Sequence, residues 1–151
     1  MLSIIPLIII TTAALIALLL TPKTAHADSG TYTWTGAWSR HIGGSGDLNE
    51  SHRLLAVEHR DWIGGYFRTS FDDDAAFVGR KFNRSVTEHI EASALVGINW
   101  GYRSSCTNSD FDGKKRVCPM FVPAVTYTGY RLKPSFMAIG DAATVSVRWE
   151  F

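Results

Sequence analysis

The chain ends with Thr144-Val145-Ser146-Val147-Arg148-Trp149-Glu150-Phe151, and this stretch decides the fold. Successive side chains of a strand point to opposite faces, so one face carries Val145, Val147, Trp149 and Phe151 while the other face is polar. On the exposed end of a soluble protein, four apolar side chains would promote aggregation. In a transmembrane barrel, lipid covers the apolar face and a polar lumen covers the other. The stretch predicts the last strand of such a barrel, with an edge strand of a soluble sandwich as the alternative.

The amino end predicts export. Leu2 to Leu20 is a nearly unbroken apolar run, and Ala25-His26-Ala27 has the small-x-small pattern of a signal-peptidase site before Asp28. No Lys or Arg precedes the run, which is long enough to span a membrane, so a retained anchor is the alternative. We predict a signal peptide at 1–27 and a barrel domain at 28–151. The terminal Phe resembles the assembly signal of bacterial outer-membrane barrels, and we expect the protein in the bacterial outer membrane.

Composition excludes several classes of protein. The formal net charge is +1, and removal of Lys23 with the signal peptide leaves equal numbers of basic and acidic residues. The mature chain has room for one domain, and without a basic cluster no nucleic-acid partner is expected. We expect a monomer that contacts membrane lipids and needs no cofactor or metal. Asp72-Asp73-Asp74 could hold a divalent cation with lipid phosphates, but the favoured interpretation is a solvated turn.

Cys106 and Cys118 are the only cysteines, and they flank a polar stretch. An exported protein meets an oxidising compartment, so we predict a disulfide that closes a loop and contributes roughly 3 kcal/mol. A zinc site would need further ligands close by, and the sequence offers none.

Alternating apolar and polar residues, interrupted by turn residues, predict an all-β fold of eight antiparallel strands. The predicted strands are Thr31–His41, Arg53–Arg60, Ile63–Phe71, Ala75–Phe82, Val86–Tyr102, Phe121–Thr128, Arg131–Ile139 and Ala142–Phe151. Their connections fall into two groups. One side of the barrel carries the longer ones, 42–52 and 103–120, together with Asp72-Asp73-Asp74 and Gly140-Asp141. The other side carries short turns, as is usual for the periplasmic side of outer-membrane barrels.

Alternation also assigns side chains to the lumen. In the third strand it points Phe67, Thr69 and Phe71 outward and Tyr66, Arg68 and Ser70 inward. The periplasmic half of the lumen is predicted to hold a plug of paired charges, since buried charges must be paired. Its members are Glu58, Arg60, Arg80, His89, Glu91, Arg148 and Glu150. The outer half, lined by Leu54, Ala56, Ala76, Val78, Leu95 and Gly97, is apolar. That half is either plainly packed or able to admit an acyl chain.

From Trp38 to Phe151 the chain resembles the lipid A palmitoyltransferases, small outer-membrane barrels that move an acyl chain from phospholipid to lipid A. The resemblance is carried by short pieces in matching order: Trp38-Ser39-Arg40-His41, Asn49-Glu50, Gly65-Tyr66-Phe67-Arg68-Thr69-Ser70-Phe71, Pro119-Met120-Phe121-Val122-Pro123, Gly129-Tyr130 and the terminal aromatic strand. In that family such prolines mark gaps in the barrel wall through which lipid enters. Alternatively, they only end a loop.

The resemblance implies catalytic positions at His41, Thr69 and Ser70. A His in the first outer loop and an Asp-Ser pair at the outer end of the third strand carry catalysis in the family. His41 is suited to act as general base, and the Ser70 hydroxyl to position or attack an ester carbonyl. The chain departs from the family at Thr69, where Asp is expected, and in lacking an amphipathic helix before the barrel. Two functions therefore stay open: acyl transfer to lipid A, or a non-catalytic barrel that binds or shields the surface.

Overall fold

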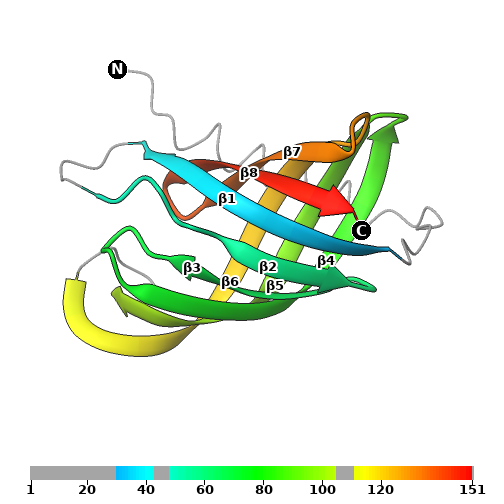
Figure 1. Ribbon diagram of the computed structural model, residues 1–151. Helices are drawn as coiled ribbons and strands as arrows, with labels where there is room; N and C mark the ends of the chain where they lie inside the picture. Colours follow the sequence, from blue (N-terminus) through cyan, green and yellow to red (C-terminus); the bar gives the residue numbers. More distant parts are fainter. Residues whose placement is uncertain (1–29, 43–47, 105–110, 151) are drawn as a thin grey trace, which may run out of the picture.

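The computed structural model describes residues 30–42, 48–104 and 111–150, which form a closed barrel of eight antiparallel strands (Figure 1). The strands are β1 (Thr31–His41), β2 (Leu55–His59), β3 (Trp62–Arg68), β4 (Asp74–Thr87), β5 (Ile90–Ser104), β6 (Phe111–Tyr127), β7 (Leu132–Ile139) and β8 (Ala142–Glu150). Each strand pairs with the next, and β8 pairs with β1, which removes the free edges that an open sheet would expose. The predicted fold class is confirmed. Among the described residues, no helix has the length and apolarity to cross a membrane.

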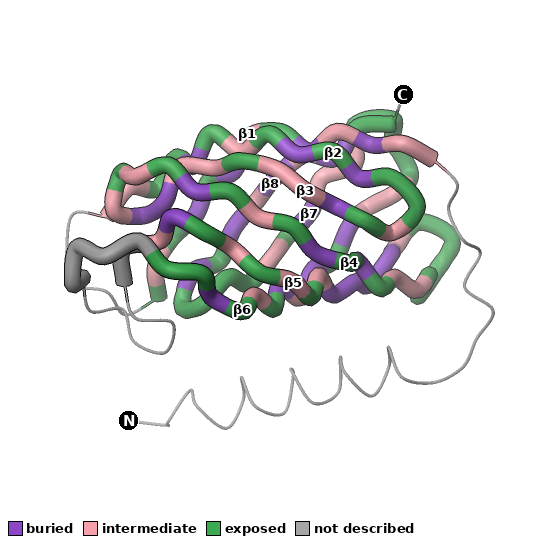
Figure 2. Tube along the Cα trace, turned by 90° about the horizontal axis from the view of Figure 1, so that it is seen from below, coloured by how far each residue is buried: buried purple, intermediate pink, exposed green. Residues whose placement is uncertain are grey.

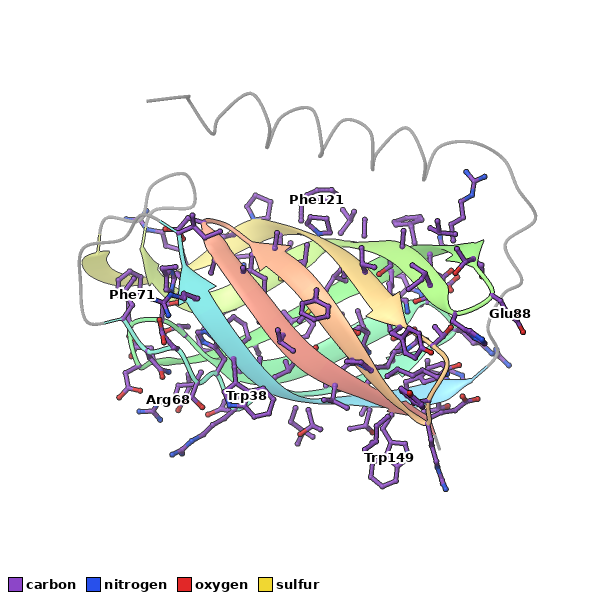
Figure 3. All side chains as sticks on the ribbon, turned by 90° about the horizontal axis from the view of Figure 1, so that it is seen from above. Trp38, Arg68, Phe71, Glu88, Phe121 and Trp149 are labelled. Atoms are coloured by element: carbon purple, nitrogen blue, oxygen red, sulfur yellow. The ribbon has the colours of Figure 1, made fainter. Side chains whose placement is uncertain are left out.

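The outer surface of the barrel is apolar. Along each strand, buried and exposed residues alternate (Figure 2). In Figure 3, Trp38, Phe121 and Trp149 project away from the wall, and their exposed fractions are 57%, 41% and 40%. Every strand contributes at least one such large apolar residue, β4 through Val78 and β5 through Ile98. An apolar outer surface on every strand is the arrangement of a barrel that spans an outer membrane.

Two strands are longer than the sequence predicts. The predicted turn at 83–85 is wrong, because β4 continues to Thr87 and turns at Glu88, which Figure 3 places at the end of the barrel opposite Phe71. Asn83 is polar because it faces the lumen, where its amide donates to Glu91 Oε2 at 3.4 Å. Strand β6 begins at Phe111 rather than Phe121, so most of the predicted 103–120 loop is strand. Its polar sequence marks an extension of the wall beyond the apolar belt.

The predicted faces of β3 and β4 are reversed in the structure. Tyr66 and Val78 are exposed on the outside, whereas Phe67 and Phe77 line the lumen with ring centroids 6.0 Å apart. Strand β3 ends at Arg68, and a turn follows it, so the inward position of Ser70 does not fix the face of the residues before it. Paired residues of neighbouring strands share a face, so β3 and β4 are reversed together.

A charged cluster fills the periplasmic half of the lumen, as predicted, but with partly different members. Lys81 Nζ lies 2.8 Å from Glu58 Oε1 and 3.1 Å from Glu91 Oε1, and Arg148 contacts the same two oxygens at 2.8 and 3.1 Å. The indole N–H of Trp34 donates to Glu58 at 2.7 Å. Lys81 takes the place predicted for Arg80. Because the faces of β4 are reversed, Arg80 points to the outside of the barrel. The charges of the two cations and the two carboxylates cancel, as is required of charges that are buried.

The other predicted plug residues lie outside this cluster. Arg60 and His89 are exposed in or beside the periplasmic turns. Glu150 is partly exposed and pairs with Lys133 at 2.9 Å.

Strands β6 and β7 are joined over only part of their length. Their ladder has three residue pairs, Ala124–Met137, Val125–Phe136 and Thr126–Ser135. Pro123 and Pro134 bracket this ladder, and proline has no N–H to extend it. Pro119 and Pro123 both lie inside β6, so the alternative that they merely end a loop is wrong.

Two predictions fall on residues outside the described part of the chain. The signal peptide at 1–27 is one of them. The other is the disulfide, because Cys106 is not among the described residues, although Cys118 is buried on β6. Both stay predictions.

Candidate functional site

His41 faces the lumen because of a bulge in β1. Tyr32 and Trp34 point inward, and plain alternation from them would turn His41 toward the outside. The pairing of β1 with β8 shifts by one residue between Thr35 and Ala37, where Gly36 has a φ of 60°. A glycine at positive φ is the usual means of accommodating such an extra residue. Beyond the bulge the inward positions are Ala37, Ser39 and His41.

Ser70 is brought into the lumen by the turn after β3, and Thr69 organises this turn. The buried Thr69 hydroxyl accepts from the backbone N–H groups of Phe71 and Asp73 at 3.3 and 3.2 Å. The Thr69 N–H donates to the Asp73 carbonyl at 2.7 Å, and the Asn49 N–H donates to the Ser70 carbonyl at 2.9 Å. The predicted site residue Thr69 therefore holds the turn with its hydroxyl rather than contacting His41.

The structure brings the other two predicted site residues together. His41 Nε2 lies 3.0 Å from Ser70 Oγ, within hydrogen-bonding distance, although 29 positions separate the two residues in the chain. The opposite ring nitrogen, His41 Nδ1, lies 3.2 Å from Asp141 Oδ1. The His41 side chain is 11% exposed and that of Asp141 is 57% exposed. Serine, imidazole and carboxylate thus form a continuous row at the outer rim.

Sequence reasoning missed Asp141. The Gly140-Asp141 turn was placed on the same side of the barrel as the loop after His41, but no short motif connects the two. The available signal was closure of the barrel, which pairs the first strand with the last and makes His41 the partner of Ala142.

An apolar cavity of about 630 Å³ occupies the outer half of the lumen and reaches His41, Ser70 and Asp141 at its rim. Its wall includes Leu54, Phe67 and Phe77, and its floor is formed by residues of the charged cluster and their neighbours, including Trp34 and Lys81. The outer half is therefore hollow rather than plainly packed. A volume of this size is typical of sites for small molecules.

The cavity also reaches the lipid-facing surface. Phe121 and Ile139 both line it, and Phe121 pairs with the exposed Val96 on the outer face of the wall and is itself 41% exposed. These residues belong to β6 and β7, beyond the end of the short ladder between the two strands. The cavity consequently has a lateral opening at the unpaired part of this seam.

His52 lies next to the site and links β1 to β3 through hydrogen bonds. Its Nδ1 lies 2.7 Å from the Arg68 carbonyl oxygen, which can only accept, so Nδ1 carries the proton. Its Nε2 then accepts from the Ser39 hydroxyl at 2.6 Å. Burial lowers the pKa of His52, the bond to the Arg68 carbonyl opposes this, and the charge of nearby His41 lowers the pKa further. His52 therefore acts as a neutral bridge between β1 and β3.

The acidic turn after β3 is engaged with neighbouring side chains. Arg68 Nε donates to Asp72 Oδ1 at 2.6 Å, which lowers the pKa of the Asp72 carboxyl. The Tyr66 hydroxyl donates to Asp74 at 2.5 Å. Across the described ranges, no group of three or more His, Cys, Asp or Glu is arranged to hold a metal ion.

No family model and no curated protein matches the chain. Two solved structures of the outer membrane protein Ail from Yersinia pestis are similar to it. The first, in a phospholipid bilayer nanodisc, is 14% identical, covers 82% of this chain and 100% of Ail, and has a TM-score of 0.44. The second, in complex with the heparin analogue sucrose octasulfate, is 15% identical, covers 78% and 91%, and has a TM-score of 0.35. At these identities, no activity or partner passes from Ail to this chain.

Proposed function

We propose that this barrel is an outer-membrane enzyme that transfers an acyl chain from a phospholipid to lipid A. The observation that carries the proposal is the contact between Ser70 and His41 at the mouth of an apolar cavity. A serine hydroxyl is a weak nucleophile at neutral pH, and an adjacent imidazole is a common way to activate it. The donor and acceptor classes come from the resemblance of residues 38–151 to lipid A palmitoyltransferases.

The reaction follows from the positions of the two groups. Ser70 Oγ attacks the ester carbonyl carbon of the phospholipid while His41 Nε2 takes the hydroxyl proton. The bond between the carbonyl carbon and the glycerol oxygen then breaks, and His41 returns the proton to the leaving lysophospholipid. In the second half, His41 removes a proton from a lipid A hydroxyl, which attacks the acyl-Ser70 ester. Ser70 regains its proton from His41, so the enzyme is restored.

The cavity and its lateral opening explain how a lipid substrate reaches the serine. An acyl chain enters from the membrane at the unpaired part of the β6–β7 seam, beside Phe121 and Ile139, and lies against the apolar wall. The chain passes from one apolar environment to another, so this step has little hydrophobic cost or gain. The charged cluster below stops the chain, because displacing its paired ions would leave buried charges unpaired.

The test measures the two products of the transfer, acylated lipid A and lysophospholipid, together with the free fatty acid that hydrolysis would release. The full chain in outer membranes is supplied with phospholipid labelled in one acyl chain, and acylated lipid A, lysophospholipid and free fatty acid are quantified. Ser70→Ala and His41→Ala are expected to lower transfer by about 100-fold or more. The control is Ser51→Ala, an exposed hydroxyl at the same rim.

Two results would contradict the proposal. Equal transfer by wild type and both alanine variants would show that the site is wrong. If wild type produces neither acylated lipid A nor free fatty acid, the alternative of a non-catalytic surface barrel replaces the proposed enzyme.

A further inference from the structure

The β7–β8 turn is held beside His41 by backbone pairing. His41 is the partner of Ala142 in the β1–β8 ladder, and the Ile42 N–H donates to the Asp141 carbonyl at 3.0 Å. Gly140, with a φ of 59°, completes the two-residue turn that presents Asp141. The backbone of Asp141 thus has a fixed place next to His41.

The two contacts of the imidazole use opposite nitrogens. A carboxylate can only accept a hydrogen bond, so the contact from Asp141 to Nδ1 requires a proton on Nδ1. Nε2 is then free to accept, and Ser70 Oγ lies 3.0 Å from it. A neutral imidazole in this tautomer is the form that can take a proton from a serine.

We infer that Asp141 is the positioning carboxylate of this site. It provides, from the β7–β8 turn, the carboxylate that is expected at position 69 and that Thr69 lacks. The inference rests on the proposed function of Ser70 and His41. Asp72 and Asp74, two of the three consecutive acidic residues that follow β3, interact with Arg68 and Tyr66 instead. Asp141 acts through His41 and has no contact with the substrate in this mechanism.

The exposure of Asp141 limits the size of its effect. Water screens a carboxylate with a side chain 57% exposed, so its charge stabilises a protonated His41 less than a buried Asp would. Its main contribution is to fix the tautomer and the orientation of the His41 ring. We expect loss of the carboxylate to lower transfer by about 10- to 100-fold, less than the roughly 10⁴-fold seen where the Asp is buried.

The decisive measurement is the tautomer of His41, which does not depend on catalysis. Nitrogen NMR of the full-length mature barrel in nanodiscs, at about pH 8.5 where an ordinary His is neutral, reports which ring nitrogen carries the proton. His41 is assigned among the four His of the mature chain, residues 28–151, by comparison with His41→Gln. The variants are Asp141→Ala, the conservative Asp141→Glu, and Glu88→Ala as a control in a periplasmic turn.

Wild type, Asp141→Glu and Glu88→Ala are expected to carry the proton on Nδ1, whereas Asp141→Ala shifts it toward Nε2. In the transfer assay, Asp141→Glu is expected to retain part of the activity that Asp141→Ala loses. The same tautomer in wild type and Asp141→Ala would overturn the inference, as would undiminished transfer by Asp141→Ala. A tautomer shift without transfer by any variant would uphold the positioning role and reject the proposed function.

Discussion

His41 and Asp141 are 100 residues apart in the chain, yet they lie in contact where β1 and β8 close the barrel. Figure 1 shows these two strands side by side, one from each end of the chain. The contact exists because the bulge at Gly36 turns His41 inward before the strand ends. The orientation of the site therefore depends on one glycine located well below the rim.

The first prediction concerns this bulge. Gly36→Ala should lower the free energy of unfolding by more than the 1–2 kcal/mol or so that a positive φ costs an ordinary residue, because its Cβ would also come within 2.7 Å of the Trp38 ring. Gly140→Ala is the matched control, since Gly140 has the same φ and its Cβ would meet nothing within 4 Å. The stability of both variants is measured as the temperature at which heating changes their migration in a gel. Equal losses would show that the contact with Trp38 contributes nothing.

The second prediction concerns the charged cluster. Glu58→Ala should destabilise the barrel by roughly 3–5 kcal/mol, because it leaves Lys81 and Arg148 buried with one carboxylate between them. The double variant Glu58→Gln with Lys81→Met should be more stable than Glu58→Ala, because charge balance returns. Glu150→Ala, at an exposed pair, should cost less than about 1 kcal/mol. A Glu58→Ala barrel as stable as wild type would count against the pairing.

The sequence predicts the strands of the barrel wall better than the arrangement of residues at its outer rim. Alternation and turn residues predicted the eight strands, and the order of short motifs predicted that His41 and Ser70 meet. Alternation failed at β3 because the Thr69 turn interrupts it. It would also have failed at His41, because a bulge adds a residue without a polar or apolar signal. Asp141 could not be found from local sequence, since only closure of the barrel brings it to the site.

The third prediction is a loss of stability in acid. Burial lowers the pKa of His52 below its ordinary value of about 6.5. Below pH ~6.5 the unfolded chain therefore binds a proton that the folded barrel does not, so stability falls as pH falls until the folded pKa is reached. His52→Gln removes this contribution. Unfolding measured between about pH 7.5 and 5 should show a smaller pH slope for the variant. Parallel slopes would exclude His52 as the source.

The fourth prediction concerns position 69. The missing Asp suggests from sequence that Thr69→Asp would raise transfer. In the structure, His41 Nδ1 is already occupied by Asp141, and the Thr69 hydroxyl is directed into its own turn. We expect no gain from Thr69→Asp in the wild-type background, with Thr69→Ser as the conservative control. A gain in the transfer assay would show that a carboxylate at 69 reaches His41 and that Asp141 is not sufficient.

The central claim is that His41 makes Ser70 a nucleophile at the mouth of a cavity for an acyl chain. Its most direct measurement is labelling of the membrane-embedded barrel with a long-chain alkyl fluorophosphonate, from which a nucleophilic serine displaces fluoride. Mass spectrometry of the labelled peptides then locates the adduct. The account predicts an adduct on Ser70 that is lost in His41→Ala and unchanged in Ser51→Ala. Absence of any adduct, or equal labelling of Ser70→Ala, would contradict it.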